Sequence, residues 1–424
     1  MTEEERQIKN NKIREKCQQT RIKRKSQFCL VFRVKIDFSH LNERQKTQLK
    51  MIFVEAKWLY NDALTFISSS NISDINEYDY KTTTVHGLDK DRQPVTHELE
   101  NLSSQMKQSV IQSIKNNLKT LSALKDQGRK VGKLKYKSDY NSINLKQYGQ
   151  TYKFTDKKHI RLQGIKKPLK IEGTEQFFDI PGIEFANAKL LNLPDGYYIA
   201  ITTFQNKGVE QKKYKQKIGI DMGIKTSITT SEGKKFKVYV GETERLKKLQ
   251  RKIMRRKKGS SNRYRARKLL RKEYQKLTNR KKDAANKIVN ELLKHEKIYM
   301  QDENIKGWHK GLFGKTVQHS ILGILKAKLM KNERVSVLPV NVPTTKYCPN
   351  CGKINKDIKL SDRVYECTCG YKEDRDIHAA RNMILLSEGS TCGTQETWTS
   401  SPKRLWRGRK TTSTLEVGAQ TSLN

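Results

Sequence analysis

Apolar residues recur at helical spacing in two stretches of the first third of the chain. From Leu49 to Ile67 they return at steps of three and four residues, which predicts a helix over residues 42–67. The same period predicts a second helix over residues 98–125, ended by Gly128. Such stripes are typical of buried helix faces. We therefore expect these residues to pack a core and not to form a binding site.

Runs of apolar and β-branched residues predict strands on either side of these helices. Residues 28–37 form one such run, and short runs between turn residues follow from 129 to 210, a spacing typical of a small barrel or sandwich. Residues 69–97, rich in Ser, Asn, Asp and Thr, are expected to form a loop. Lysines alternate in the barrel region with aromatic residues, which fits either cross-strand aromatic pairs or a surface that stacks bases. These aromatic residues are Tyr136, Tyr140, Tyr148, Tyr152 and Phe154.

A second series of strands begins after residue 210. The stretch Lys217–Ser231 is expected to contain a strand that delivers Asp221 at the end of an apolar run, between Gly219 and Gly223. Residues 234–241 alternate between apolar and polar and should pair beside it. Further strands are expected at 297–303 and 334–342, with a loop and a helix between them at 307–332.

Charge changes this picture more than length does. The 424 residues have room for two or three domains, and 87 Lys and Arg against 44 Asp and Glu give a net charge of +43. A compact protein with such a surplus repels itself unless a polyanion neutralises it, so nucleic acid is the expected partner. An acidic membrane surface fits less well, because we find neither an apolar run of transmembrane length nor a signal-peptide core. We therefore expect a cytoplasmic protein without a membrane partner.

The most basic segment spans residues 245–282, with 19 Lys or Arg and one acid, Glu273. Its apolar residues keep helical spacing and GSSN at 259–262 interrupts them, which predicts a two-helix hairpin with a cationic outer face. Charge runs are usually only solvated, but one with so little compensating acid is better explained by a bound phosphate backbone. The residues expected to bind nucleic acid are Lys247, Arg251, Arg255, Arg256, Arg263, Arg267 and Arg271.

Four of the seven cysteines form two knuckles. Cys348 and Cys351 make the first, Cys367 and Cys369 make the second, and a glycine follows each knuckle. Four thiolates suit a tetrahedral structural zinc ion and leave no open position for a substrate. The odd number of cysteines and their grouping argue against a secreted disulfide framework. We expect one structural zinc ion at these four residues.

Three acidic clusters lie at the ends of predicted elements: Asp221, residues 298–305 and residues 372–384. Taken singly, each is explained by helix caps and turns. Together they offer oxygen ligands from separate elements, as hard cations such as Mg²⁺ require. Two such ions activate water and stabilise the leaving oxygen when a phosphodiester is hydrolysed. On this reasoning the third cluster supplies Asp374 or Asp376.

Five motifs in a fixed order resemble a known family. GIDMGIK, the basic hairpin, DENIKGW, CPNC with CTCG, and DRDIHAARNM are similar to the RuvC-type nuclease half of the transposon-encoded TnpB proteins and of the compact type V CRISPR effectors. The motifs cover residues 218–384, and over 27–210 only the order of elements is similar. The resemblance implies RNA-guided cleavage of double-stranded DNA beside a short flanking motif, by a monomer or homodimer on one guide RNA.

Family roles transfer residue by residue only where the motifs match. Asp221 matches the first catalytic acid, and the third motif selects Asp376 over Asp374. His378 stands where the family usually has Asn.

The second motif departs from the family pattern. Gln301 occupies the usual Glu position, and an amide cannot replace a carboxylate ligand. Side chains two apart share a face of a strand, so we expect Glu303 to serve, with Asp302 as the alternative. The predicted site is therefore two Mg²⁺ ions at Asp221, Glu303 and Asp376.

The resemblance implies an α+β multidomain protein: an RNase H-like (RuvC) α/β nuclease core with an inserted zinc-ribbon-like module, and an N-terminal wedge β-barrel with a helical recognition insertion. Two functions compete with a Mg²⁺-dependent RNA-guided endonuclease: a guide-dependent DNA-binding regulator with an inactive nuclease centre, and a DNA transposase.

The predicted segments are a basic N-terminal arm, solvated and disordered or bound to nucleic acid (1–26), the barrel (27–41 and 128–212), the helical module (42–127), the nuclease (213–345 and 373–388, with the basic hairpin at 242–294), the zinc module (346–372) and a disordered tail (389–424).

Overall fold

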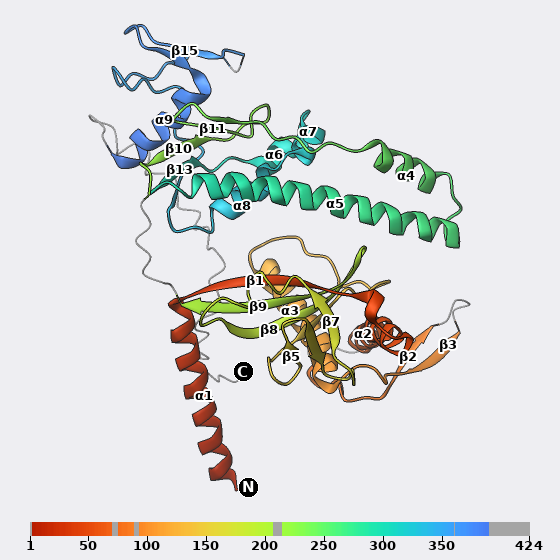
Figure 1. Cartoon of the computed structure of the whole chain (residues 1–424). Coiled ribbons are helices and arrows are strands. Elements are labelled where there is room, and N and C mark those ends of the chain that lie inside the picture. The colour runs from red at the N-terminus through yellow and green to blue at the C-terminus, as the bar shows by residue number, and fades with distance from the viewer. Residues whose placement is uncertain (1, 70–74, 89–92, 207–213, 360, 390–424) are drawn as a thin grey trace, which may run out of the picture. The chain divides into compact units, whose positions relative to one another are not determined.

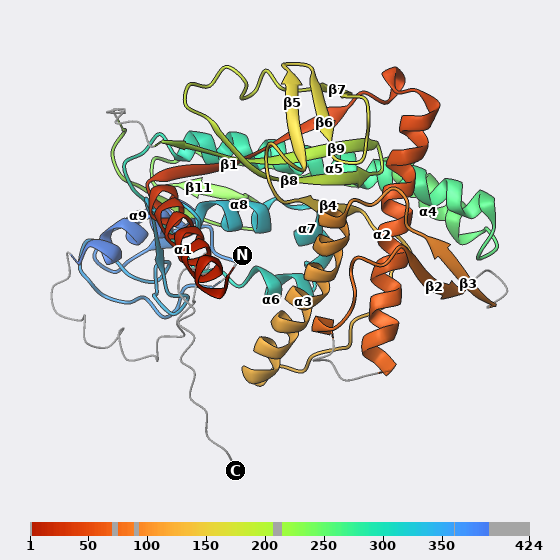
Figure 2. The ribbon, with the colours of Figure 1, turned by 90° about the horizontal axis from the view of Figure 1, so that it is seen from below.

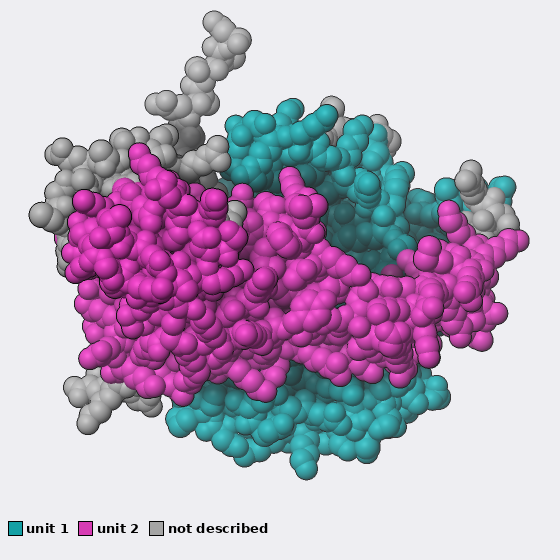
Figure 3. All heavy atoms as spheres, turned by 90° about the horizontal axis from the view of Figure 1, so that it is seen from above, with its two compact units in different colours: residues 1–209 teal, residues 210–424 magenta. Residues whose placement is uncertain are grey.

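The computed structural model describes residues 2–69, 75–88, 93–206, 214–359 and 361–389. The chain divides into two compact units, residues 1–209 and 210–424 (Figure 3). Beyond Gly389, the predicted tail lies outside the described residues. Within the described ranges, no helix has both the length and the apolar character needed to cross a membrane.

The first element is a helix, α1 (Glu3–Lys25), so the disordered alternative for this segment is wrong, while nucleic-acid binding by the segment stays a prediction. A capping box starts it: the Thr2 hydroxyl accepts a hydrogen bond from the Glu5 N–H, and the Glu5 carboxylate accepts one from the Thr2 N–H. Acidic residues fill the first turn and basic residues the last, which complements the helix dipole. Because every residue of α1 is exposed or nearly so, the helix has no apolar period to reveal it.

A seven-stranded antiparallel sheet forms the core of the first unit. Its strands are β1 (Gln27–Ile36), β4 (Ser142–Leu145), β5 (Tyr152–Asp156), β6 (His159–Leu162), β7 (Leu169–Glu172), β8 (Glu184–Leu193) and β9 (Gly196–Asn206). They pair in the order β4-β8-β9-β1-β7-β6-β5. The sheet curls into a nearly closed barrel, since the Tyr152 hydroxyl of β5 donates to the Ala186 carbonyl of β8 at 2.8 Å.

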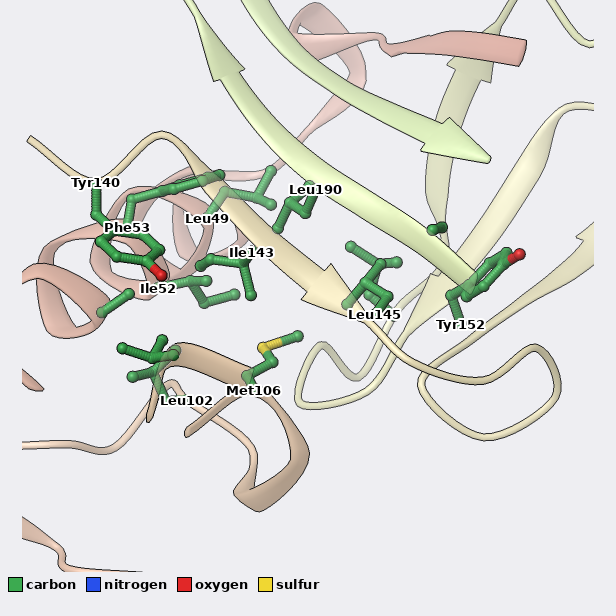
Figure 4. Packing of buried hydrophobic residues seen from close by; sticks show 14 of the residues in the cluster. Leu49, Ile52, Phe53, Leu102, Met106, Tyr140, Ile143, Leu145, Tyr152 and Leu190 are labelled. Carbon is green, nitrogen blue, oxygen red and sulfur yellow. The ribbon is translucent and has the colours of Figure 1, made fainter. Parts of the chain in front are cut away.

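Two predicted helices are inserted between β1 and β4. After a short 3₁₀ turn (Phe38–His40) come α2 (Glu43–Ser69) and α3 (Ser104–Asp126), which pack against each other (Figure 2). Their apolar stripes share one core with β4 and β8, where Leu49, Met106, Ile143 and Leu190 are fully buried (Figure 4). The helical stripes are core residues, as predicted.

Between α2 and α3 the expected loop contains a hairpin. Its strands are β2 (Thr84–Leu88) and β3 (Pro94–Glu98), which pair in antiparallel register. Val85 is the one fully buried residue of the two strands. Because nearly all their side chains are polar or exposed, the segment lacks the apolar alternation by which strands are recognised.

The aromatic residues of the barrel region mostly pack inside it. Tyr140, Tyr152 and Phe154 are buried, and the Phe154 and Phe185 rings lie 5.0 Å apart across the seam between β5 and β8. Tyr136 is exposed. The packing interpretation of this pattern is therefore the correct one for the buried residues.

A five-stranded mixed sheet organises the second unit. It consists of β10 (Ile218–Asp221), β11 (Ile228–Thr230), β12 (Lys235–Phe236), β13 (Ile298–Gln301) and β14 (Val335–Leu338), in the order β12-β11-β10-β13-β14. β10, β13 and β14 run parallel to one another, β11 is antiparallel to β10, and β12 is antiparallel to β11. The ends of β10 and β13 therefore meet at one edge, and Asp221 lies at this edge.

The predicted basic hairpin consists of α4 (Glu244–Met254) and α5 (Ser261–Leu292). Gly259 adopts a φ of 88° in the turn, and the Ser260 hydroxyl caps α5 by accepting from the Arg263 N–H. The C-terminal half of α5 packs Ile288 and Leu292 into the core beneath the sheet. The unit also contains three short helices and one longer helix: α6 (Ile305–Lys310), α7 (Gly314–His319), α8 (Leu322–Leu329) and α9 (Arg375–Glu388).

Helix α9 lies directly against β10 (Figure 1). A Cβ atom on Gly219 would lie 1.8 Å from the carbonyl oxygen of Ala380, which is far inside van der Waals contact. The glycine is therefore required by close approach of two backbones.

Gly219→Ala should destabilise the protein by about 3 kcal/mol or more, because the new methyl group forces α9 away from β10. Urea unfolding measures the change. Gly323→Ala is the matched control, since a Cβ on that α8 residue meets nothing within 4 Å, and alanine there should be neutral or slightly stabilising. Equal stability of the two variants would contradict the close contact.

Candidate functional site

Three acidic side chains from separate elements line one pocket of about 680 Å³ in the second unit. Asp221 ends β10, Glu303 follows β13, and Asp376 lies in the first turn of α9. The structure thus brings the three predicted carboxylates into a common pocket.

These carboxylates interact electrostatically. The pKa of Asp221 is raised to about 7, first by burial and then by the negative charges of Asp376 and Glu303, while Arg375 opposes the rise. Burial also raises the pKa of Glu303. Mutually repelling, partly desolvated carboxylates are a donor set that a hard divalent cation would satisfy.

The side chain of Gln301 does not line the carboxylate pocket but is hydrogen-bonded to residues 339–344. Its amide group donates to three backbone carbonyls of residues 339–342 at 2.8 to 3.1 Å, and its carbonyl oxygen accepts from the Thr344 hydroxyl. Strand β13 ends at Gln301, so the argument that Glu303 shares its strand face is wrong. Instead the chain turns after Gln301, which is buried beside the 339–344 segment, and Glu303 reaches the pocket.

The alternative acid of the second motif has another partner. Asp302 is half-exposed and forms an ion pair with Lys326 of α8. Lys326 also donates to the backbone carbonyl of Glu303. Of the two candidates, only Glu303 is among the described residues that line the pocket.

Asp374 has a structural role at the start of α9. Its carboxylate accepts from the backbone N–H groups of Asp376 and Ile377 at 3.1 and 3.2 Å and pairs with Lys235 at 2.7 Å. It is the N-cap of the helix, which leaves Asp376 as the acid of this motif that lines the pocket.

His378 of α9 packs against the cysteine-rich module, residues 346–372. Its ring is fully buried and stacks on Tyr365 at 3.8 Å with an angle of 15°. Its Nε2 lies 3.0 Å from the side-chain nitrogen of Asn382. Burial lowers the pKa of His378 to about 4, so the ring is neutral at pH 7.

The four cysteines converge as predicted. They lie around a hairpin of β15 (Val364–Glu366) and β16 (Lys372–Asp374), with the Cys348 and Cys369 sulfurs 3.6 Å apart and those of Cys351 and Cys367 also 3.6 Å apart. Four sulfurs at about 2.3 Å from a tetrahedral zinc ion would be separated by about 3.8 Å. In the part of the chain that the structure describes, no other group of His, Cys, Asp or Glu gathers so closely, the three carboxylates included.

The backbone and electrostatics of this cluster also suit a metal. Gly352 and Gly370 have φ values of 71° and 88°, and each N–H donates back to the first cysteine carbonyl of its knuckle. The Asn350 side chain and the Tyr371 N–H lower the pKa of Cys369 to about 6. Burial raises the pKa of the Cys348 thiol, which a zinc ion would have to overcome by displacing its proton.

The predicted cationic residues of the hairpin fall into two groups. Arg256 and Arg263 are half-buried and close the turn, because the Arg263 guanidinium donates to the Arg256 carbonyl and that of Arg256 to the Asn262 carbonyl. The other side chains are exposed on α4, at its C-cap and on α5, and Lys247 also pairs with Glu244. They are Lys247, Arg251, Arg255, Arg267 and Arg271.

Sequence reasoning missed the other residues that line the carboxylate pocket. Among them are five cationic and two aromatic residues, namely Lys225, Lys346, Lys359, Arg363, Arg375, Trp308 and Phe313. They come from four separate segments, and spacing along the chain cannot report such a convergence. The glycine-flanked stretch GWHKGLFG held the one signal, two aromatic residues close together among glycines.

Comparisons with known proteins cover Asp221, Asp376 and the four cysteines, whereas Glu303, Trp308 and Phe313 lie between the two matched regions. Residues 200–302 match the family OrfB_IS605, described as a probable transposase, and residues 320–383 match the Cas12f1-like TNB domain. The resemblance to TnpB proteins and compact type V CRISPR effectors is confirmed.

Individual relatives are similar over part of their length. A Streptomyces pristinaespiralis protein named "Putative RNA-guided DNA endonuclease" is 29% identical over 187 residues, which are 42% of this chain and 46% of that protein. "TnpB-like protein L79" of Acanthamoeba polyphaga mimivirus is 33% identical over 130 residues, 28% of this chain and 25% of the relative. The chain thus matches less than half the length of these relatives. A solved Cas12f1–sgRNA–target DNA complex has a TM-score of 0.48 at 13% identity, covering 84% of this chain and 99% of that one.

Asp221→Asn should stabilise the protein in buffer without divalent cations, and more at pH 8 than at pH 5. The folded pKa is about 7 against an ordinary value of 3.8, so stability falls by about 1.4 kcal/mol per pH unit as the pH rises between these values. Asparagine removes this cost, which is about 1.6 kcal/mol at pH 5 and about 4 kcal/mol at pH 8. Melting temperatures measure the effect, with Asp302→Asn as control, and a larger gain at pH 5 would contradict the assignment.

Cys348→Ser should reduce bound zinc from about one ion per chain to almost none and lower the melting temperature, because a structural site needs all four thiolates. Colorimetric zinc release from the denatured protein measures the content. Cys29→Ser is the control, since Cys29 is exposed on β1. A variant at position 348 with full zinc content and unchanged stability would refute the zinc site.

Proposed function

We propose that this chain, whose residues 200–302 and 320–383 match the OrfB_IS605 and Cas12f1-like families, is an RNA-guided, Mg²⁺-dependent DNA endonuclease. The observation that carries the proposal is the pocket in which Asp221, Glu303 and Asp376 lie together with five Lys and Arg side chains. Carboxylates suit a hard cation and the basic groups suit phosphate, and a phosphodiester bound through metal ions needs both.

The acidic residues would hold the ions. Two bound Mg²⁺ ions would supply activation of the attacking water and stabilisation of the leaving oxygen. Asp221 would lose its proton on becoming a ligand, because a nearby positive charge reverses the effects that raise its pKa. Since Asp221, Glu303 and Asp376 come from a strand end, a loop and a helix start, the packing of those elements sets their separation.

The cationic residues would position the substrate. Lys359 and Arg363 reach the pocket from the cysteine-rich module, so zinc bound there would hold two phosphate-binding groups in place. The exposed cations of α4 and α5 would neutralise the backbone of guide or target, and this part of the affinity should fall as salt rises.

Pairing with a guide RNA would supply sequence specificity. In such systems the protein holds the heteroduplex through its backbone and reads only a short flanking motif in the duplex. We propose the sheet of the second unit as the RNase H-like core, the barrel of the first unit as the wedge, and α2 with α3 as the recognition insertion. The number of copies per guide follows from the mass of the purified complex.

The proposal is tested with protein purified from a host that carries its native locus. RNA should copurify, and the protein should cut a duplex matching that RNA in the presence of Mg²⁺. Glu303→Gln should lower cutting about 100-fold or more, because it removes a metal ligand without changing the shape of the side chain. Asp302→Asn should cut like the wild type, since its carboxylate pairs with Lys326 outside the pocket.

A third variant separates Gln301 from Glu303. Gln301→Glu would set a carboxylate against three backbone carbonyls, so it should lower stability and not improve cutting. Faster cutting by a stable Gln301→Glu variant would show that position 301 is the ligand. Absence of any bound RNA would refute the proposed function, and bound RNA without cutting would favour the DNA-binding regulator.

A further inference from the structure

We infer that Trp308 and Phe313 form a stacking wall of the carboxylate pocket, against which one unpaired base of the strand to be cut is held. This inference rests on the proposed function and names the form of the substrate at the site. Both residues line the same pocket as Asp221, Glu303 and Asp376. They belong to the α6–α7 segment at the edge of the sheet (Figure 1).

The two rings are supported in different ways. Trp308 is half-buried and packs partly against the core beneath the sheet, which fixes its position. Phe313 is 59% exposed, although it is one of the most apolar side chains. It nevertheless lines the pocket that holds the three carboxylates, so its ring is accessible to a molecule bound there.

The backbone of this segment fixes the outward position. The Gly314 N–H donates to the Gly311 carbonyl at 3.0 Å, and the Val317 N–H donates to the Phe313 carbonyl at 2.9 Å. A Cβ on Gly314 would lie 2.4 Å from the His309 carbonyl oxygen, so the turn needs glycine there. Phe313 is thus set at the start of α7 by a tight, hydrogen-bonded turn.

The chemistry of the other residues identifies the occupant. Carboxylates, cations and two aromatic rings share one pocket, and a nucleotide is the ligand that offers metal-binding phosphate oxygens and a flat base together. A base inside a duplex is stacked on both faces and cannot also stack on a side chain. The wall therefore fits a single strand. Stacking accepts any base, so it would not add sequence preference.

The test uses full-length protein as purified and single-stranded DNA of about 12 nucleotides carrying 2-aminopurine, whose fluorescence is quenched by stacking. Binding is measured without Mg²⁺, so no cutting is needed. Phe313→Ala should weaken binding about 5- to 100-fold and abolish the quenching of one labelled position. Phe313→Tyr should retain both, because it keeps the ring.

Leu312→Ala is the matched control, since Leu312 is adjacent and wholly exposed but is not among the residues that line the pocket. It should bind and quench like the wild type. The inference is overturned if the wild type does not quench the label, or if Phe313→Leu binds and quenches like the wild type. It is also overturned if Leu312→Ala loses as much affinity for the single strand as Phe313→Ala. A further contradicting result is that Phe313→Ala weakens binding of a blunt duplex by the same factor as binding of the single strand.

The outcome is separable from that of the proposed function. Protein that cuts a guided duplex without any Phe313-dependent quenching refutes the stacking wall alone. Protein that shows Phe313-dependent quenching but cuts no duplex supports the wall and refutes the nuclease.

Discussion

The contact between Gly219 and Ala380 sets the distance between β10 and α9, and the carboxylate pocket depends on that distance. Asp221 lies two residues after the glycine, and Asp376 lies about one helical turn before Ala380. With the Ala380 carbonyl only 1.8 Å from where a Cβ would stand, any side chain at position 219 would separate the two acids. The absence of a side chain at Gly219 therefore allows Asp221 of β10 and Asp376 of α9 to face the same pocket.

A second set of contacts fixes the segment that joins this core to the cysteine-rich module. Gln301 holds residues 339–344 from the β13 side, and the Asn382 amide donates to the carbonyls of Thr344 and Tyr347 at 2.8 and 2.7 Å from the α9 side. Buried amides with several backbone partners are costly to disturb. The pocket residues Thr345 and Lys346 lie between these anchors, so hydrogen bonds hold this wall of the pocket in place although its acids remain electrostatically unfavourable.

The sequence predicted those features whose signal is local and periodic. The helices α2, α3, α4 and α5 and the cysteine cluster follow from apolar spacing and knuckle spacing. They are where we expected them, except that α3 begins at Ser104 and not at residue 98. Helix α1 was missed because capping and charge, not apolar burial, define it. The hairpin β2–β3 was missed because its strands bury only Val85 and their other apolar residues do not alternate with polar ones. Glu303 was selected by a strand-face argument that fails, since β13 stops at Gln301 and a turn carries Glu303 to the pocket. Trp308 and Phe313 became visible only through tertiary convergence.

The central claim is that Asp221, Glu303 and Asp376 hold divalent cations together. Anomalous diffraction from crystals soaked in Mn²⁺, an oxygen-preferring stand-in for Mg²⁺, tests it most directly. The account predicts anomalous peaks in the pocket, with carboxylate oxygens of all three residues as ligands. Peaks held by Asp221 and Asp376 alone, with Glu303 turned away, or no peak in the pocket at all, would contradict it.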